Sequence, residues 1–132
     1  MQSLMIKEGE YTPAVSFDST RNVLALSGKS FPENASAFYT PLFEWLQEYL
    51  GQLDDDDEVL VTIDLRYYNS SSDRKISDFL GMLNTKAFDD AIAIDVNWCY
   101  EEDDDGLREC GEDFETDYRA IVFNLIEIPV ED

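Results

Sequence analysis

Histidine is absent from this 132-residue sequence, and basic residues are scarce, with nine Lys and Arg against 30 Asp and Glu. The absence of histidine removes the commonest general base, the usual partner of a nucleophilic serine, and a frequent zinc ligand. The formal net charge of −21 opposes approach to nucleic-acid phosphates and to anionic membrane surfaces. We therefore expect a protein that is not an enzyme, needs no cofactor, and binds neither nucleic acid nor membranes.

The sequence also lacks any apolar run near the roughly 20 residues that a membrane-spanning helix needs. Its first ten residues lack the basic and then apolar pattern of a signal peptide. The two cysteines, Cys99 and Cys110, lie in unlike contexts, so we expect free thiols in a reducing compartment. Together these absences predict a cytoplasmic protein.

Apolar residues make up 44% of the chain and aromatic residues 13%, which is enough for one domain with a sizeable core over residues 1–132. The hydrophobic periodicity predicts about five strands and three helices. The expected strands span residues 13–17, 22–27, 59–65, 91–100 and 120–128, with helices before Gly51, after Ser72 and over 105–117. We expect an α/β fold, in which an N-terminal antiparallel hairpin precedes helix-connected, mostly parallel strands of one mixed sheet.

The central strand and the first helix carry two further expectations. The near-continuous apolar run over residues 59–65 predicts a strand that is covered on both faces. Pro41 leaves two starts for the first helix: Thr40 caps it with Pro41 at the first position, or it begins near Asn34 and kinks. We favour the start near Asn34.

The segment that follows the central strand is the most informative part of the sequence for function. Asn69 and three hydroxyl residues, Ser70, Ser71 and Ser72, stand where a helix begins. A helix start exposes unpaired N–H groups and the positive end of the helix dipole. Hydroxyls there either cap the helix, which is their common role, or present an oxygen that can carry a phosphate. We interpret Ser70 as a regulatory switch.

The charge distribution singles out the same segment. Residues 31–65 carry a net charge of −9 and residues 87–132 a net charge of −14, whereas residues 1–30 are neutral. Residues 66–86 carry +2, which makes them the basic stretch of the chain. Arg66, Arg74 and Lys75 are close enough to the serines in sequence to be candidate partners of a phosphate.

There are three competing interpretations, of which two involve other chemistry and one involves no modification of the chain. Residues 101–112 fit much of a calcium loop, with Gly106 at the turn, but the first ligand position is Glu and a strand precedes it. The Glu101–Asp105 cluster therefore supports an alternative function as an acidic Ca²⁺- or Mg²⁺-binding protein or a hydrolase. Ser72–Lys75 matches the Ser-x-x-Lys of serine acylases, whose other elements are absent. The third interpretation is an acidic interaction module without modification.

Several segments in this order resemble the SiaC family of bacterial regulatory phosphoproteins. They are Phe31-Pro32-Glu33-Asn34, the aromatic helix through Trp45, the stretch Leu65 to Ser72, and Asn97-Trp98-Cys99-Tyr100-Glu101 followed by Glu112-Asp113-Phe114. The resemblance runs over nearly the whole chain, which makes it more specific than any single motif.

The resemblance implies a small α/β protein similar in architecture to the anti-sigma-factor antagonists. It implies phosphorylation by a dedicated kinase, removal of the phosphate by a matching phosphatase, and an unmodified form that binds and promotes a diguanylate cyclase in biofilm signalling. The family's acceptor is a threonine after an asparagine, and Ser70 stands at that position. Ser71 and Ser72 remain alternative acceptors.

Overall fold

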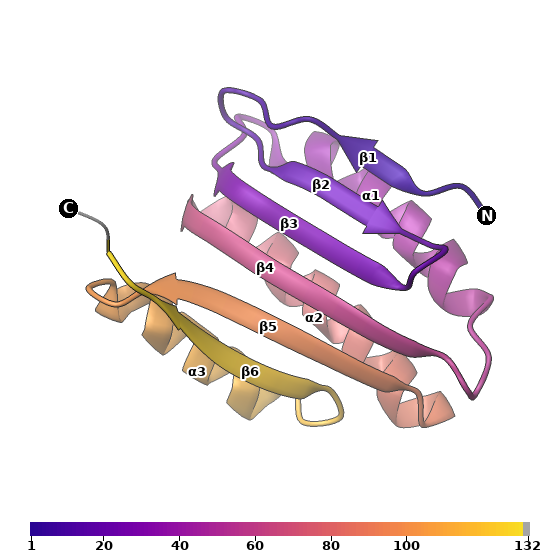
Figure 1. Cartoon of the computed structure of the whole chain (residues 1–132). Coiled ribbons are helices and arrows are strands. Elements are labelled where there is room, and N and C mark those ends of the chain that lie inside the picture. The colour runs from indigo at the N-terminus through magenta and orange to yellow at the C-terminus, as the bar shows by residue number, and fades with distance from the viewer. Residues whose placement is uncertain (131–132) are drawn as a thin grey trace.

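The computed structural model describes residues 1–130, which form one mixed sheet and three helices (Figure 1). The elements are β1 (Leu4–Ile6), β2 (Ala14–Asp18), β3 (Val23–Ser30), α1 (Ala35–Gly51), β4 (Glu58–Tyr68), α2 (Ser70–Asp90), β5 (Ala93–Glu101), α3 (Asp105–Asp117) and β6 (Val122–Ile128). The expected α/β class and the three expected helices are confirmed. No helix among these elements is long and apolar enough to cross a membrane.

The strands lie in the sheet in their sequence order, from β1 at one edge to β6 at the other. β1, β2 and β3 pair antiparallel, and β3, β4, β5 and β6 pair parallel. The predicted antiparallel start and parallel continuation are therefore confirmed. The sheet has six strands instead of about five, because β1 is only three residues long, too short for its alternation to be recognised.

All three helices cover the same face of the sheet (Figure 1). In β4 the side chains of Val59, Val61 and Ile63 are buried, whereas Leu60 on the opposite face is 39% exposed. The expectation that residues 59–65 are covered on both faces is therefore wrong. Parallel crossovers share one hand, and here each crossover also steps to the next strand in the same direction, so their helices fall on one side.

Helix α1 begins after Asn34, as the favoured prediction stated. The Asn34 side chain accepts a hydrogen bond from the backbone N–H of Ala37 at 3.1 Å, and Pro41 lies inside the helix. A proline in a helix interior costs about 3 kcal/mol. Burial of Leu42 and Leu46, both with no exposed surface, offsets that cost by packing the helix against the sheet.

The side chain of Trp98 on β5 occupies the core beneath α3. Its indole N–H donates to the backbone carbonyl of Leu107 at 3.0 Å, and its ring lies 5.3 Å from the ring of Phe114. Gly111 faces the indole from α3: a Cβ at this position would lie 2.5 Å from Trp98 Cδ1. The close approach of α3 to the sheet therefore depends on a residue without a side chain.

Candidate phosphorylation site at the start of α2

Asn69 caps α2 through both its side chain and its backbone. Its side-chain oxygen accepts from the backbone N–H of Ser72 at 2.9 Å, which satisfies one of the unpaired donors of the helix start. Its own N–H donates to the carbonyl of Ser30 at the end of β3, at 3.0 Å. These bonds hold the first turn of α2 against the end of the neighbouring strand.

The three serines after the cap lie in different environments. Ser70 and Ser71 are exposed, whereas Ser72 has no exposed surface. The Ser72 hydroxyl lies 2.8 Å from the Ser30 hydroxyl, which lies 2.6 Å from the hydroxyl of Tyr39 on α1. Ser72 is therefore part of a buried hydrogen-bond network, and its hydroxyl presents no surface to a kinase in the folded protein.

The buried network joins α1, β3 and α2 beneath the exposed serines. Burial raises the pKa of Tyr39 above its ordinary value, although hydrogen bonds to Ser30 and Ser72 oppose the shift. The phenol is thus neutral at physiological pH and can donate as well as accept. A neutral, satisfied network of this kind fixes the relative positions of the two helix starts.

The starts of α1 and α2 lie side by side and border an open cavity of about 830 Å³. From α2 it is lined by Ser70, Ser71, Arg74 and Lys75. From α1 and the preceding loop it is lined by Glu33, Asn34, Ala35 and Ser36. The structure thus brings together the predicted acceptor, its neighbour Ser71 and two of the three predicted basic residues, beside a second helix start that also favours anions.

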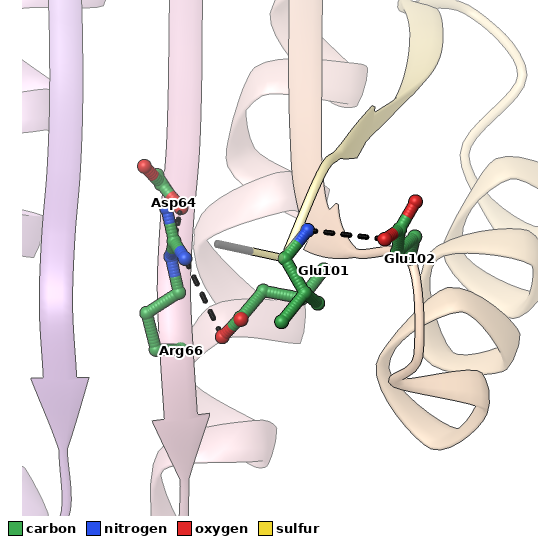
Figure 2. Close-up of polar contacts among 5 residues, drawn as sticks. Asp64, Arg66, Glu101 and Glu102 are labelled. Atoms are coloured by element: carbon green, nitrogen blue, oxygen red, sulfur yellow. Dashed lines mark hydrogen bonds and ion pairs between the residues drawn. The ribbon is translucent and has the colours of Figure 1, made fainter. Parts of the chain in front are cut away.

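Arg66 is the predicted basic residue that does not border this cavity. Its guanidinium donates to Asp64 at 2.9 Å and contacts Glu101 at 3.4 Å on the open face of the sheet (Figure 2). The hydrogen bond to Asp64 is the main cause that raises the pKa of Arg66. The expectation that Arg66 accompanies the serine cluster is corrected: its charge is engaged by two carboxylates elsewhere.

Three residues of the acidic segment that suggested a metal site make contacts within the protein. Glu101 contacts Arg66, and a Glu102 carboxylate oxygen accepts from the backbone N–H of Val130 at 3.2 Å (Figure 2). Asp104 caps α3 by accepting from the N–H of Leu107 at 3.0 Å. Within residues 1–130, no three His, Cys, Asp or Glu side chains are grouped so that they could hold a metal ion.

The contribution of α1 to the cavity was not predicted from the sequence. Ser36 is exposed in the first turn of α1 and borders the same cavity as Ser70. The two serines are 34 positions apart, and only the parallel pairing of β3 with β4 brings their helices together. The single signal in the sequence was Asn34, because an asparagine before Ala-Ser marks a helix start.

Replacement of Asn69 by alanine should lower the free energy of unfolding by about 0.5–2 kcal/mol, because the N–H of Ser72 loses its acceptor. Urea denaturation followed by circular dichroism measures this change. Asn34→Ala removes the equivalent cap of α1, an exposed one, and is the matched control. A stability equal to that of the parent in Asn69→Ala would contradict the assigned role of the cap.

A mixed sheet covered on one face by three helices, with an exposed serine at a capped helix start, defines a small α/β domain. The model of the family described as "SiaC family regulatory phosphoprotein" matches residues 6–128. The chain belongs to the SiaC family, and the resemblance inferred from the sequence is confirmed.

Individual proteins with known sequences or structures agree with this assignment. An uncharacterized protein of Pseudomonas aeruginosa strain UCBPP-PA14 is 28% identical over 119 residues, which cover 89% of this chain and 90% of that protein. The structure of SiaC of Pseudomonas aeruginosa is 23% identical and superposes with a TM-score of 0.82, covering 98% of this chain and 100% of that one.

A second solved structure contains a complex. It is the diguanylate cyclase SiaD bound to its activator SiaC from Pseudomonas aeruginosa, and the matching chain is 23% identical to this one. The TM-score is 0.82, with coverage of 96% of this chain and 99% of that chain. At this level of identity the likeness establishes the fold that the two proteins share.

Proposed function

We propose that this protein is the phosphoacceptor of a bacterial kinase and phosphatase partner switch, that Ser70 carries the phosphate, and that the protein itself is not an enzyme. The observation that carries the proposal is the contrast between an exposed Ser70 and a buried Ser72 at one capped helix start. Membership of a family of regulatory phosphoproteins supports the same function. The partners are a cognate protein kinase, a protein phosphatase and an effector protein.

A phosphate on Ser70 would enter an environment that stabilises it. The phosphate adds about −1.5 to −2 charge at pH 7. The first N–H groups of α2 and the side chains of Arg74 and Lys75 lie around the same cavity and favour an anion there. The chain as a whole is strongly acidic, but a phosphate in this cavity would lie near two basic side chains. The modification therefore requires no rearrangement of the fold.

The unmodified form is the one that we expect to bind and promote an effector, a diguanylate cyclase. The complex of SiaC with SiaD from Pseudomonas aeruginosa supports this choice, because that SiaC is the activator of a cyclase. A partner surface that accommodates the bare Ser70 hydroxyl would have to desolvate a dianion after phosphorylation. Phosphorylation should therefore remove the interaction.

The test compares the unmodified and the phosphorylated protein for binding to the purified diguanylate cyclase of the same genome. We expect the phosphorylated form to bind at least about 100-fold more weakly, because an uncompensated buried charge costs several kcal/mol. Isothermal titration calorimetry measures both affinities. Treatment of the phosphorylated protein with the cognate phosphatase is the control and should restore binding. Equal affinities of the two forms would contradict the proposed switch.

A further inference from the structure

We propose that three aromatic residues near the carboxyl ends of β3 and β4, Tyr11, Phe31 and Tyr67, form the anchor of the effector interface, with Ser70 at its rim. We call these residues the aromatic cluster. The inference rests on the proposed function, because it assigns a surface to the effector that this function requires. The partner that packs on the aromatic cluster is an apolar segment of the cyclase.

The rings of the aromatic cluster pack together through Phe31, although two of them are exposed. Phe31 lies edge-on to both tyrosines, with ring centroids 5.3 Å from Tyr11 and 5.8 Å from Tyr67. The backbone N–H of Phe31 donates to the carbonyl of Tyr11 at 2.9 Å and ties the two loops together. Tyr11 and Tyr67 are each 52% exposed. Exposed but ordered aromatic rings are typical anchors of interfaces, because little conformational freedom is lost on binding.

A β-bulge places Tyr67 on the open face. Gly28 on β3 pairs with Leu65 on β4, but the next residue, Lys29, pairs with Tyr67, so Arg66 is an additional residue in β4. Without this residue Tyr67 would follow the alternation of Leu65 and point into the core. Bulges that redirect side chains are frequent next to functional sites. Here the bulge exposes a ring that regular pairing would have buried.

The aromatic cluster and Ser70 share one end of the molecule. The loop that carries Tyr11 lies at the carboxyl ends of β3 and β4, where α2 begins (Figure 1). Ser30, next to Phe31, accepts the backbone hydrogen bond from Asn69 at 3.0 Å. Tyr67 and Ser70 lie on either side of the point where β4 ends and α2 begins, so a partner that covers Tyr67 and extends over this end of the sheet would reach Ser70. This proximity explains how a modification of one hydroxyl reaches an interface anchored by aromatic rings.

The charges of the protein and of the proposed phosphate limit which partners can pack on the aromatic cluster. A second copy would bring together two chains that each carry a net charge of −21, which opposes self-association. A strongly basic partner surface beside Ser70 is also disfavoured, because it would bind the phosphorylated form more tightly and reverse the proposed switch. An apolar segment that packs on the rings and leaves Ser70 against a neutral surface satisfies both conditions.

The experiment measures the affinity of the purified cyclase for four full-length variants. Tyr67→Ala and Tyr11→Ala remove the exposed rings, and we expect each to weaken binding at least about 10-fold. Tyr67→Phe keeps the ring and should bind within about threefold of the parent. Phe88→Ala is the matched control, because Phe88 is 78% exposed but lies about 27 Å further along α2. Its affinity should equal that of the parent, and thermal unfolding establishes that each variant is folded.

The possible results distinguish an error in the proposed interface from an error in the proposed effector. Unchanged affinity in every one of the two alanine variants that folds, with a parent protein that binds the cyclase, overturns the inference and leaves the switch intact. An equal loss in Phe88→Ala also overturns it, because the loss would not then depend on position. A parent protein that does not bind the cyclase overturns the proposed effector, and the inference with it. Having two alanine variants keeps the test decisive if one of them fails to fold.

Discussion

Alanine in place of Ser70 should abolish phosphate incorporation by the cognate kinase. Ser70 is exposed at the edge of the cavity, so a kinase can reach its hydroxyl. Arg74 and Lys75 border the same cavity and can bind the phosphate once it is attached. We expect the loss to be complete, because the resemblance to the SiaC family places the acceptor at Ser70 and not at its exposed neighbour Ser71. Phosphopeptide mass spectrometry and radiolabel incorporation both measure the effect.

Two matched variants distinguish the acceptor from its neighbours. Ser71→Ala should be phosphorylated to the level of the parent, although Ser71 is also exposed. Ser72→Ala should keep its phosphorylation and lose stability, because the Ser30 hydroxyl loses a partner at 2.8 Å inside the core. Incorporation at the normal level in Ser70→Ala would assign the phosphate to another residue.

Ser70→Asp should weaken effector binding only in part, since one carboxylate supplies less charge than a phosphate.

The largest expected loss of stability follows from adding a single methyl group to Gly111. Its Cβ would lie 2.5 Å from Trp98 Cδ1 and 2.7 Å from Leu125 Cδ2. The indole cannot move aside easily, because it is buried and its N–H is bonded to the carbonyl of Leu107. We expect Gly111→Ala to lower the free energy of unfolding by about 1–3 kcal/mol, despite the higher helix propensity of alanine.

The same substitution at Gly51 provides the control with the opposite sign. Gly51 is the last residue of α1, and a Cβ there meets no atom within 4 Å. Gly51→Ala should therefore stabilise the protein by up to about 1 kcal/mol, because alanine has less freedom to lose on folding. Urea titrations of the two variants measure the difference. A Gly111→Ala variant as stable as Gly51→Ala would show that α3 can shift away from the sheet without cost.

The sequence predicted the elements of the fold well where hydrophobic periodicity was strong. Helix α3 spans Asp105–Asp117, the range expected from its apolar line, and the order of five strands and three helices is confirmed. Local pattern could not establish that only one face of β4 would be covered. That outcome depends on every crossover stepping in one direction, which is a property of the whole sheet and not of residues 59–65.

The predicted proximity of the residues was correct along one helix and wrong between elements. Ser70, Arg74 and Lys75 meet at one cavity because they lie within two turns of α2. Arg66 is only four residues before Ser70, yet it lies on the open face of β4 and contacts Asp64 and Glu101. Spacing in a sequence predicts proximity within a helix, but a change from strand to helix breaks that relation. Ser36 was missed for the complementary reason, since nothing local connects α1 with α2.

The net negative charge of this protein opposes pairing of strand β6, an edge of the sheet, with other molecules. The strand is seven residues long, its register with β5 is unbroken, and Val122 and Ile126 are 56% and 40% exposed. Regular apolar edges readily pair with other chains and begin aggregation. Mutual repulsion between molecules with a net charge of −21 opposes such pairing at neutral pH. As the pH falls towards the isoelectric point near 4.1, that protection is lost, so colloidal stability depends on ionised carboxylates.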